Sequence, residues 1–316
     1  MSIKVNRFTF HCTFTTEARL PEYLGSALRG ALGWSLKKTS CALRTRQCQS
    51  CILREQCAYA WIFETERYRD SNGRSVNARP HPFVLQPGEG TSGFRKAGDQ
   101  FDFSLLLIDR AIDYLPHIIF TLQRMGEGGI GAGNRSGMGR FRLDRVSAGN
   151  EEIYNADEEV LHKPEECEQL ALETGAKTTT REIEVQLLTP LRVKLGNELH
   201  DELPFHVLVR SGLRRIAALE EAYGGGEPNL DYRGIISRAE LVETVKSSIK
   251  WREMLRFSNR QRQKVSLSGL TGAISYRGEL DEFMPLLTYC ENVHLGKQTV
   301  FGLGRISVTH RGKEGK

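Results

Sequence analysis

Two short segments of this sequence resemble each other although they lie far apart in the chain. Gly137-Met138-Gly139-Arg140 returns near the C-terminus as Gly302-Leu303-Gly304-Arg305. Each copy follows a helical pattern that contains a proline and leads into a strand-like stretch. This recurrence of helix, glycine-rich loop, arginine and closing strand predicts two related domains in tandem. Glycines permit positive φ and a close backbone approach, and the arginine that follows them is suited to phosphate.

The order of apolar patterns also repeats. Residues 3–14 alternate, with a change of phase that predicts a bulge or bend, and a helical pattern follows to about Lys38. Residues 149–181 are acidic and lack clear periodicity, which predicts a linker. A chain of 316 residues can form two domains of ordinary size. We therefore expect an α+β protein in which residues 1–148 and residues 182–316 each form a ferredoxin-like β-α-β-β-α-β domain.

The charge is unevenly distributed. The net charge is only +5, but residues 1–60 hold nine Lys or Arg against three acids, and residues 233–264 hold nine against three. Two basic domains separated by an acidic segment fit a polyanion bound by both domains. Solvated charged faces joined by a charged linker explain the same pattern, and charge alone leaves both interpretations open. No apolar run is long enough to span a bilayer, and the N-terminus does not resemble a signal peptide, so we expect a cytoplasmic protein.

Four of the seven cysteines lie close together, with the pattern C-x6-C-x2-C-x5-C. In a cytosolic protein this spacing favours a metal over disulfides. Four thiolates predict a structural Zn²⁺ that would tie the loop 41–57, inserted in the first domain, without taking part in catalysis. An iron–sulfur cluster is the second possibility, and reduced thiols packed in a loop are the third. The expected ligands are Cys41, Cys48, Cys51 and Cys57.

Further motifs resemble those of a known family. The segment 251–261, Gly269-Leu270-Thr271-Gly272, and the stretch from His294 to Arg305 are similar to the RAMP superfamily of CRISPR-associated RNA-binding proteins. Together with Leu28-Arg29-Gly30-Ala31-Leu32-Gly33 and Pro80-His81-Pro82, they resemble the endoribonuclease that cuts precursor CRISPR RNA within its repeats. The resemblance implies metal-independent cleavage, in which a ribose 2′-OH attacks the adjacent phosphorus and leaves a 2′,3′-cyclic phosphate. It also implies that the processed guide RNA stays bound and joins other CRISPR-associated effector subunits.

The same resemblance directs attention to the first helical segment. Relatives often carry a Tyr or His on or just after this helix, but residues 23–38 contain no His, and Arg29 stands where some relatives carry the Tyr. Arg29 is either a buried structural cation or a phosphate ligand that stabilises the transition state. Lys37 and Lys38 either protonate the leaving group or face solvent, and His81 is either a site residue or a turn residue that packs locally.

Other cations flank the glycine-rich loops and the strands of the second half. RNA duplexes are recognised largely through backbone and 2′-OH contacts, so clustered Lys and Arg on loops fit a stem-loop RNA. For His294 we weigh RNA contact against closure of the C-terminus of a helix. The expected RNA-binding residues are Arg135, Arg140, Arg192, Lys194, Arg256, Arg260, His294, Lys297 and Arg305.

Two alternatives to the nuclease remain at this point. A non-catalytic RAMP subunit that binds guide RNA in an effector complex is favoured by the missing helix His, whereas the C-terminal motif favours the nuclease. A zinc-stabilised nucleic-acid-binding regulator is disfavoured, because the sequence has no helix-turn-helix pattern.

Overall fold

The computed structural model describes residues 2–44, 47–69, 75–164, 167–172, 180–193, 202–258 and 263–310. The chain divides into two compact units. One comprises residues 4–169, and the other comprises residues 170–316 with the first three residues. Among the described residues, no helix combines the length and the apolar character that crossing a bilayer requires.

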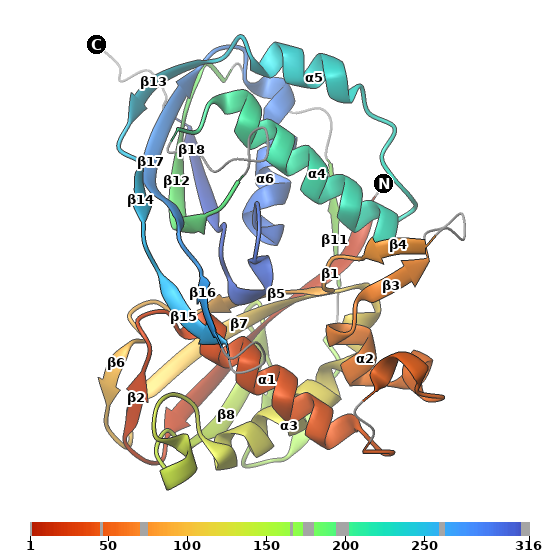
Figure 1. The fold of residues 1–316 in the computed structure, drawn as a ribbon, viewed down its shortest axis with the longest axis vertical. Helices are drawn as coiled ribbons and strands as arrows, with labels where there is room; N and C mark the ends of the chain where they lie inside the picture. Colours follow the sequence, from red (N-terminus) through yellow and green to blue (C-terminus); the bar gives the residue numbers. More distant parts are fainter. Residues whose placement is uncertain are drawn as a thin grey trace. The chain divides into compact units, whose positions relative to one another are not determined.

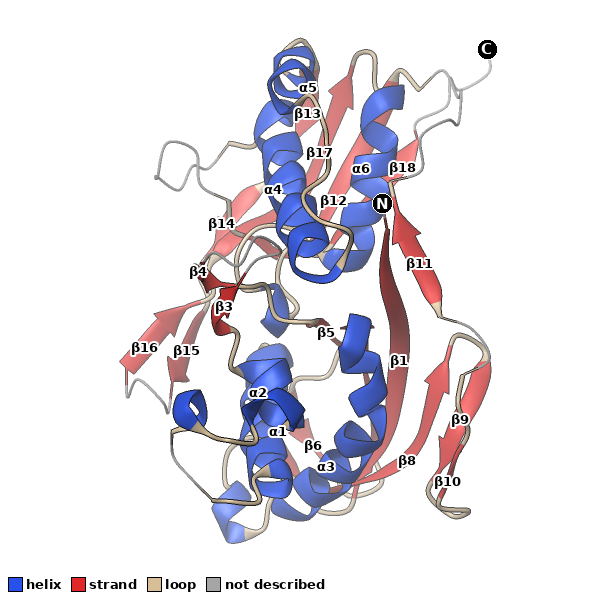
Figure 2. Ribbon diagram, turned by 90° about the vertical axis from the view of Figure 1, so that its right-hand side faces the viewer, coloured by secondary structure: helices blue, strands red, loops and turns tan. Residues whose placement is uncertain are grey.

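The first unit is built on an antiparallel sheet whose central strand is β1. The strands run in the order β10-β9-β8-β1-β7-β5, and β11 pairs with β1 off this path. Figure 1 labels β1, β5, β7 and β8, and Figure 2 labels β9 and β10 beside β8. Buried and less buried residues alternate along β1, with the expected change of phase near Asn6 and a shift of register against β8 at His11. The strands are β1 (Ser2–Phe14), β5 (Phe83–Pro87), β7 (Gln100–Ile108), β8 (Phe141–Ala148), β9 (Glu151–Asn155), β10 (Val160–Leu161) and β11 (Glu168–Ala171).

Two helices, α1 (Leu24–Ser40) and α3 (Leu115–Gly128), lie side by side against this sheet (Figure 2). Leu28, Leu32 and Leu36 recur at helical spacing on α1 and are buried, which anchors the helix to the core. A short helix, α2 (Ala58–Phe63), contacts α1. Two short antiparallel pairs complete the unit: β2 (Ala18–Leu20) with β6 (Gly93–Arg95), and β3 (Glu66–Arg69) with β4 (Ser75–Ala78).

The second unit has its own antiparallel sheet, in the order β13-β17-β12-β18, with β14 pairing β17. Helices α4 and α6 contact each other, and Phe205 of α4 packs against Tyr276 of β17 and against Phe283. A separate pair of strands, β15 (Leu255–Ser258) and β16 (Gln263–Ser266), extends from this unit. The remaining elements are β12 (Glu182–Leu191), β13 (Glu243–Ser247), β14 (Lys250–Arg252), β17 (Gly269–Arg277), β18 (Ile306–His310), α4 (Phe205–Tyr223), α5 (Tyr232–Ala239) and α6 (Met284–Val293).

The two sheets share one strand order. In each sheet, the first strand of the half lies between two others: the strand that follows the glycine-rich loop, and the strand that precedes the helix before that loop. A fourth strand pairs with the other edge of the strand that precedes this helix. Thus β1 lies between β8 and β7, and β12 lies between β18 and β17. The duplication expected from the repeated loop is therefore present in the topology.

The segment 149–181, expected to be a linker, differs from that expectation. Strands β9 and β10 fall within it and extend the first sheet, because Ile153 and Tyr154 are buried against the unit. Charged neighbours such as Glu151 and Glu152 are exposed. Because they surround a pair of only two apolar residues, the sequence shows no periodicity that would predict a strand here. The boundary between the two compact units accordingly falls near residue 170.

Candidate functional site

The first glycine-rich loop is held by a Thr hydroxyl at the end of β1. Thr16 Oγ1 donates to the Gly137 carbonyl at 3.1 Å and accepts from the Arg140 amide at 3.0 Å. The Gly139 amide bonds the Glu17 carbonyl at 2.7 Å, and its carbonyl accepts from Ile130 at 2.9 Å. A Cβ at Gly139 would overlap the Ile130 carbonyl, and its φ is 70°, so this position requires glycine.

The second loop repeats this arrangement atom for atom. Thr189 Oγ1 donates to the Gly302 carbonyl at 2.9 Å and accepts from the Arg305 amide at 2.9 Å. Gly304 bonds the Pro190 carbonyl at 3.1 Å, and a Cβ there would overlap the Leu295 carbonyl. Each loop also contains one turn of 3-10 helix, Asn134–Ser136 in the first and Thr299–Phe301 in the second. The two loops are therefore built by the same hydrogen bonds.

This shared framework presents cations to solvent. Arg135 and Arg140 are exposed on the first loop, and Lys297 is exposed on the second, whereas Arg305 is half-buried. The Lys297 amide bonds the Arg192 carbonyl at 3.1 Å, and Arg192 Nη1 donates to the Ser266 carbonyl at 3.1 Å. Arg192 and Lys297 therefore lie together at the second loop, beside the end of β16.

Arg256 joins the same region of the second unit. Its guanidinium carbon lies 4.6 Å from the centre of the Phe301 ring, which belongs to the second loop. The Arg256 side chain is half-buried, and this burial lowers the pKa of its guanidinium. The loop 296–305 thus collects Arg192, Arg256 and Lys297. Lys194 and Arg260, two further predicted RNA ligands, lie outside the described residues.

His294 is not on the surface. Its side chain has no exposed area, and its Nδ1 lies 3.2 Å from the Leu303 carbonyl. Its amide bonds the Cys290 carbonyl at 2.9 Å, where α6 ends, and its φ is 58°. Two roles were expected for His294: contact with RNA, or closure of the C-terminus of a helix. The structure contradicts the RNA contact, because a fully buried ring does not reach an external ligand. It favours the second role, at the C-terminus of α6.

Three of the four predicted catalytic residues lie around α2. Gly33 lets α1 approach so closely that a Cβ there would meet the Phe63 ring at 2.9 Å. The Arg29 guanidinium carbon lies 5.0 Å from the centre of the same ring, and the His81 ring centre lies 6.3 Å from it. Phe63 therefore brings Arg29 and His81, which are distant in sequence, to one aromatic side chain.

His81 is held by a backbone carbonyl. Its Nδ1 lies 3.0 Å from the Ile62 carbonyl oxygen, which can only accept, so Nδ1 is the donor in this contact. The ring is half-buried beside Phe83. A neutral imidazole held in this way is able to accept a proton at Nε2.

Lys37 borders the same cluster through Tyr59, which sequence reasoning missed. Lys37 Nζ lies 5.2 Å from the Tyr59 ring centre, and Tyr59 stacks on Phe63 at 5.6 Å. The Tyr59 hydroxyl donates to Glu64 at 3.1 Å. Burial raises the pKa of Tyr59 above its usual range, and the Glu64 carboxylate adds a smaller effect in the same direction. This phenol therefore stays protonated near neutral pH and does not serve as a base. Nothing in the local sequence signals this role, because Tyr59 follows the last Cys of the loop by only two residues.

Lys38 does not belong to this cluster. Its Nζ lies 5.3 Å from the ring centre of Trp34, one turn earlier on the exposed side of α1. The structure therefore places two of the three helix cations, Arg29 and Lys37, against α2.

None of the four predicted metal ligands forms a disulfide. Cys48 is buried and accepts a hydrogen bond from Lys37; burial raises the pKa of its thiol, and Lys37 opposes that rise. Across the part of the chain that the structure describes, no three His, Cys, Asp or Glu side chains lie together as a metal site would require. Coordination by Cys41, Cys48, Cys51 and Cys57 stays a prediction.

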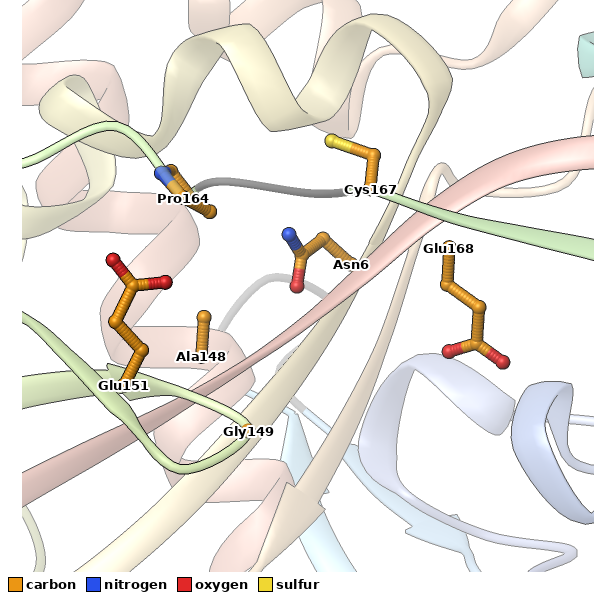
Figure 3. Close-up of a pocket in the computed structure, with 7 residues that line it drawn as sticks. All are labelled: Asn6, Ala148, Gly149, Glu151, Pro164, Cys167 and Glu168. Atoms are coloured by element: carbon orange, nitrogen blue, oxygen red, sulfur yellow. The ribbon is translucent and has the colours of Figure 1, made fainter.

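A pocket in the first unit does not suit RNA. Glu151 and Glu168 lie on its wall, together with Asn6, Cys167, Pro164, Ala148 and Gly149 (Figure 3). The two carboxylates would repel phosphate, and none of the lining residues is a cation. The loop cations and the α2 cluster, rather than this pocket, form the candidate site.

Two α+β halves, each closed by a glycine-rich loop that exposes cations, define a polyanion-binding protein of duplicated architecture. Residues 185–306 match the family model of the CRISPR-associated endoribonuclease Cas6, and residues 3–166 match a model described as AF_1859_N, an N-terminal domain. The chain therefore carries an N-terminal domain of the family described as AF_1859_N, whose model covers about half of it, and its second half is similar to the CRISPR-associated endoribonuclease that its motifs predicted.

Individual proteins are similar to this chain over most of its length. An uncharacterised protein of Archaeoglobus fulgidus is 28% identical over 289 residues, which cover 90% of this chain and 91% of that protein. A product complex of a Thermus thermophilus Cas6 has a TM-score of 0.56 at 15% identity, covering 98% of this chain and all of that one. A partial Cas6-RT-Cas1–Cas2 complex has a TM-score of 0.59 at 11% identity, covering 99% of this chain and 47% of that chain. At these identities the solved structures show the fold alone.

Proposed function

We propose that this protein is an endoribonuclease that cleaves precursor CRISPR RNA within its repeats without a catalytic metal. The observation that carries the proposal is the match of residues 185–306 to the Cas6 endoribonuclease family. The match includes the loop that gathers Arg192, Arg256 and Lys297, three cations suited to an RNA backbone. We also propose that each half is a ferredoxin-like domain, which the shared strand order supports.

The proposed reaction is an internal transesterification. The ribose 2′-oxygen bonds the adjacent phosphorus as its proton passes to a base, and the bond to the 5′-oxygen breaks as that oxygen receives a proton. The products are a 2′,3′-cyclic phosphate and a 5′-hydroxyl. Each step needs a proton acceptor, a proton donor and a cation for the charged phosphorane.

The cluster around α2 supplies these three types of group. Nε2 of His81 is the proposed proton acceptor, and the Lys37 ammonium is the proposed donor. Arg29 is the proposed phosphate ligand, because a guanidinium stays charged and presents a planar fork to phosphate oxygens. The shared contact of Arg29 and His81 with Phe63 supports their acting at one place.

A non-catalytic guide-RNA-binding subunit is the second candidate. The observation that favours it is the composition of α1: residues 24–40 contain no His, so the helix has no imidazole to accept a proton near neutral pH. Either candidate keeps the processed RNA bound and presents it to other CRISPR-associated subunits.

Cleavage in the absence of divalent metal distinguishes the candidates. The 5′-labelled repeat RNA from the same genome is incubated with the protein in excess EDTA, beside a copy that carries a 2′-deoxy substitution at the cut site. We expect one cut in the unmodified RNA, no cut in the deoxy RNA, and a 3′-terminal phosphate that phosphatase removes only after acid has opened the cyclic ester. Tight binding without any cut would establish the binding subunit instead.

The cysteine loop completes the proposal. We infer that Cys41, Cys48, Cys51 and Cys57 hold a structural Zn²⁺, with an iron–sulfur cluster as the alternative. The metal would stabilise the loop between α1 and α2 and would leave the cleavage step to side chains. Metal analysis of anaerobically purified protein tests this inference directly.

A further inference from the structure

An indole ring is exposed on the outer side of α1. Trp34 has 68% of its surface exposed, although Trp side chains usually bury most of theirs. Within α1, the residues on the same side are Gly30 one turn before and Lys38 one turn after, and both are exposed. None of the groups proposed for cleavage needs Trp34, so its exposure calls for a separate explanation.

The two sides of the indole differ. Helical side chains lean toward the helix N-terminus, so Lys38 leans over Trp34, and its Nζ lies 5.3 Å from the ring centre. Gly30 lies one turn before Trp34. A Cβ built at Gly30 would meet nothing within 4 Å, so the helix surface there is bare and open. The Lys38 ammonium group thus borders the indole, whereas the helix surface one turn before the indole is open.

We propose that this space, which we call the Trp34 slot, holds an unpaired nucleobase of the RNA substrate, stacked on Trp34; the inference rests on the proposed function. Aromatic stacking beside cations is how proteins hold single-stranded RNA. Bases within a duplex are already stacked and paired, so only an unpaired nucleotide can enter the slot. The Trp34 slot consists of Gly30, Trp34 and Lys38.

Charge on the helix supports a nucleotide rather than an apolar partner. Residues 24–40 contain Arg29, Lys37 and Lys38, and they contain no Asp or Glu. A phosphate beside a base stacked on Trp34 would therefore lie near Lys38 and would meet no carboxylate of α1. A purely hydrophobic partner would gain nothing from these cations.

The neighbouring helix offers a matched control. Phe120 on α3 is 46% exposed, and the Arg124 guanidinium carbon lies 5.3 Å from its ring centre. This pair resembles Trp34 with Lys38, but Arg124 is ion-paired with Glu127 at 2.9 Å, and Pro116 stands one turn before Phe120. Phe120 therefore has an aromatic ring and a cation, but lacks both the bare helix surface and the unopposed charge.

The test compares two RNAs of the cognate repeat, one with its unpaired flanks and one trimmed to the hairpin stem. We expect Trp34→Ala to weaken binding of the flanked RNA by about 5- to 150-fold and to change binding of the trimmed hairpin by less than about twofold. Trp34→Phe should keep most of the affinity. Gly30→Leu fills the slot without a cost to helix propensity and should weaken the flanked RNA similarly. Phe120→Ala should resemble the wild type.

Several results would overturn the inference. It fails if Trp34→Ala leaves the flanked RNA unchanged, if it weakens both RNAs equally, or if Gly30→Leu has no effect. If the wild-type protein still binds both RNAs in any of these cases, only the Trp34 slot is contradicted and the proposed function stands. Wild-type protein that binds neither RNA contradicts the proposed function and the slot together.

Discussion

At the scale of single residues, Phe63 organises the candidate catalytic cluster. It receives Arg29 from α1 on one side and lies beside His81 and Phe83 on another. Because Gly33 allows close packing of α1 on this ring, the position of Arg29 is set by packing as well as by charge. The guanidinium is therefore already positioned before RNA binds. Such preorganised charged donors are the ones that best stabilise a transition state.

Substitution of Arg29 separates catalysis from binding. We expect Arg29→Ala to slow the single-turnover cleavage rate by on the order of 100-fold, because one charged donor to the phosphorane is lost. Affinity for the repeat RNA should change much less, since the loop cations remain. Arg29→Lys keeps the charge but loses the planar fork, so its single-turnover cleavage rate should lie between those of the wild type and Arg29→Ala.

The comparison requires folded protein, so each Arg29 variant is also followed by thermal denaturation. Loss of the contact with Phe63 should lower the melting temperature slightly and equally in the presence and absence of RNA. Unchanged single-turnover cleavage in a folded Arg29→Ala protein would show that Arg29 only packs against α2.

At the scale of elements, each half is closed by a threonine bridge, which we define as Thr16 with its loop and Thr189 with its loop. Each hydroxyl joins the end of the opening strand to the glycine-rich loop by donating one hydrogen bond and accepting another. The closing strand begins directly after the bridged arginine. The bridges therefore set where β8 and β18 enter their sheets.

The threonine bridges should contribute equally in the two halves. Thr16→Val and Thr189→Val remove the hydroxyl at nearly constant volume, and each should lower the free energy of unfolding by about 1–2 kcal/mol. Urea denaturation measures this change, and Thr→Ser at either position should restore most of it. A loss in only one half would indicate that the two bridges are not energetically equivalent.

Much of the element order could be predicted from the sequence, because long periodic segments such as residues 3–14 and 205–223 carry clear burial patterns. Other elements could not. Helix α2 has six residues, which is too few to show a helical period in the sequence. Because this helix was not predicted, Tyr59, which lies on it, was not predicted as part of the site. The burial of His294 depends on how α6 meets the second loop, a contact that its position beside that motif does not reveal.

At the scale of the whole molecule, exposure decides which cations can act on RNA. Arg135, Arg140 and Lys297 are exposed, whereas Arg305 and Arg256 are partly withdrawn into the protein. The modest net charge of +5 conceals this division, because it counts buried and exposed groups equally. Binding should therefore depend on salt according to the exposed loop residues.

Lys297 provides the sharpest case. We expect Lys297→Ala to reduce the slope of log affinity against log salt concentration by about 0.7–0.9, the amount for one phosphate contact. Lys96→Ala removes an equal charge from an exposed turn whose amide is bonded to Asp99, and it should leave the slope unchanged. Equal slopes for both variants and the wild type would exclude Lys297 from the RNA interface.

The threonine bridges also constrain how the chain folds during synthesis. Thr16 and Gly137 are 121 residues apart, and Thr189 and Gly302 are 113 apart. At ~5–20 residues per second, each half waits on the order of ten seconds before its closing strand leaves the ribosome. Until then, one edge of β1 or β12 lacks its final partner and offers unpaired amides and carbonyls to other chains. These intervals are the moments at which the nascent protein is most open to mispairing.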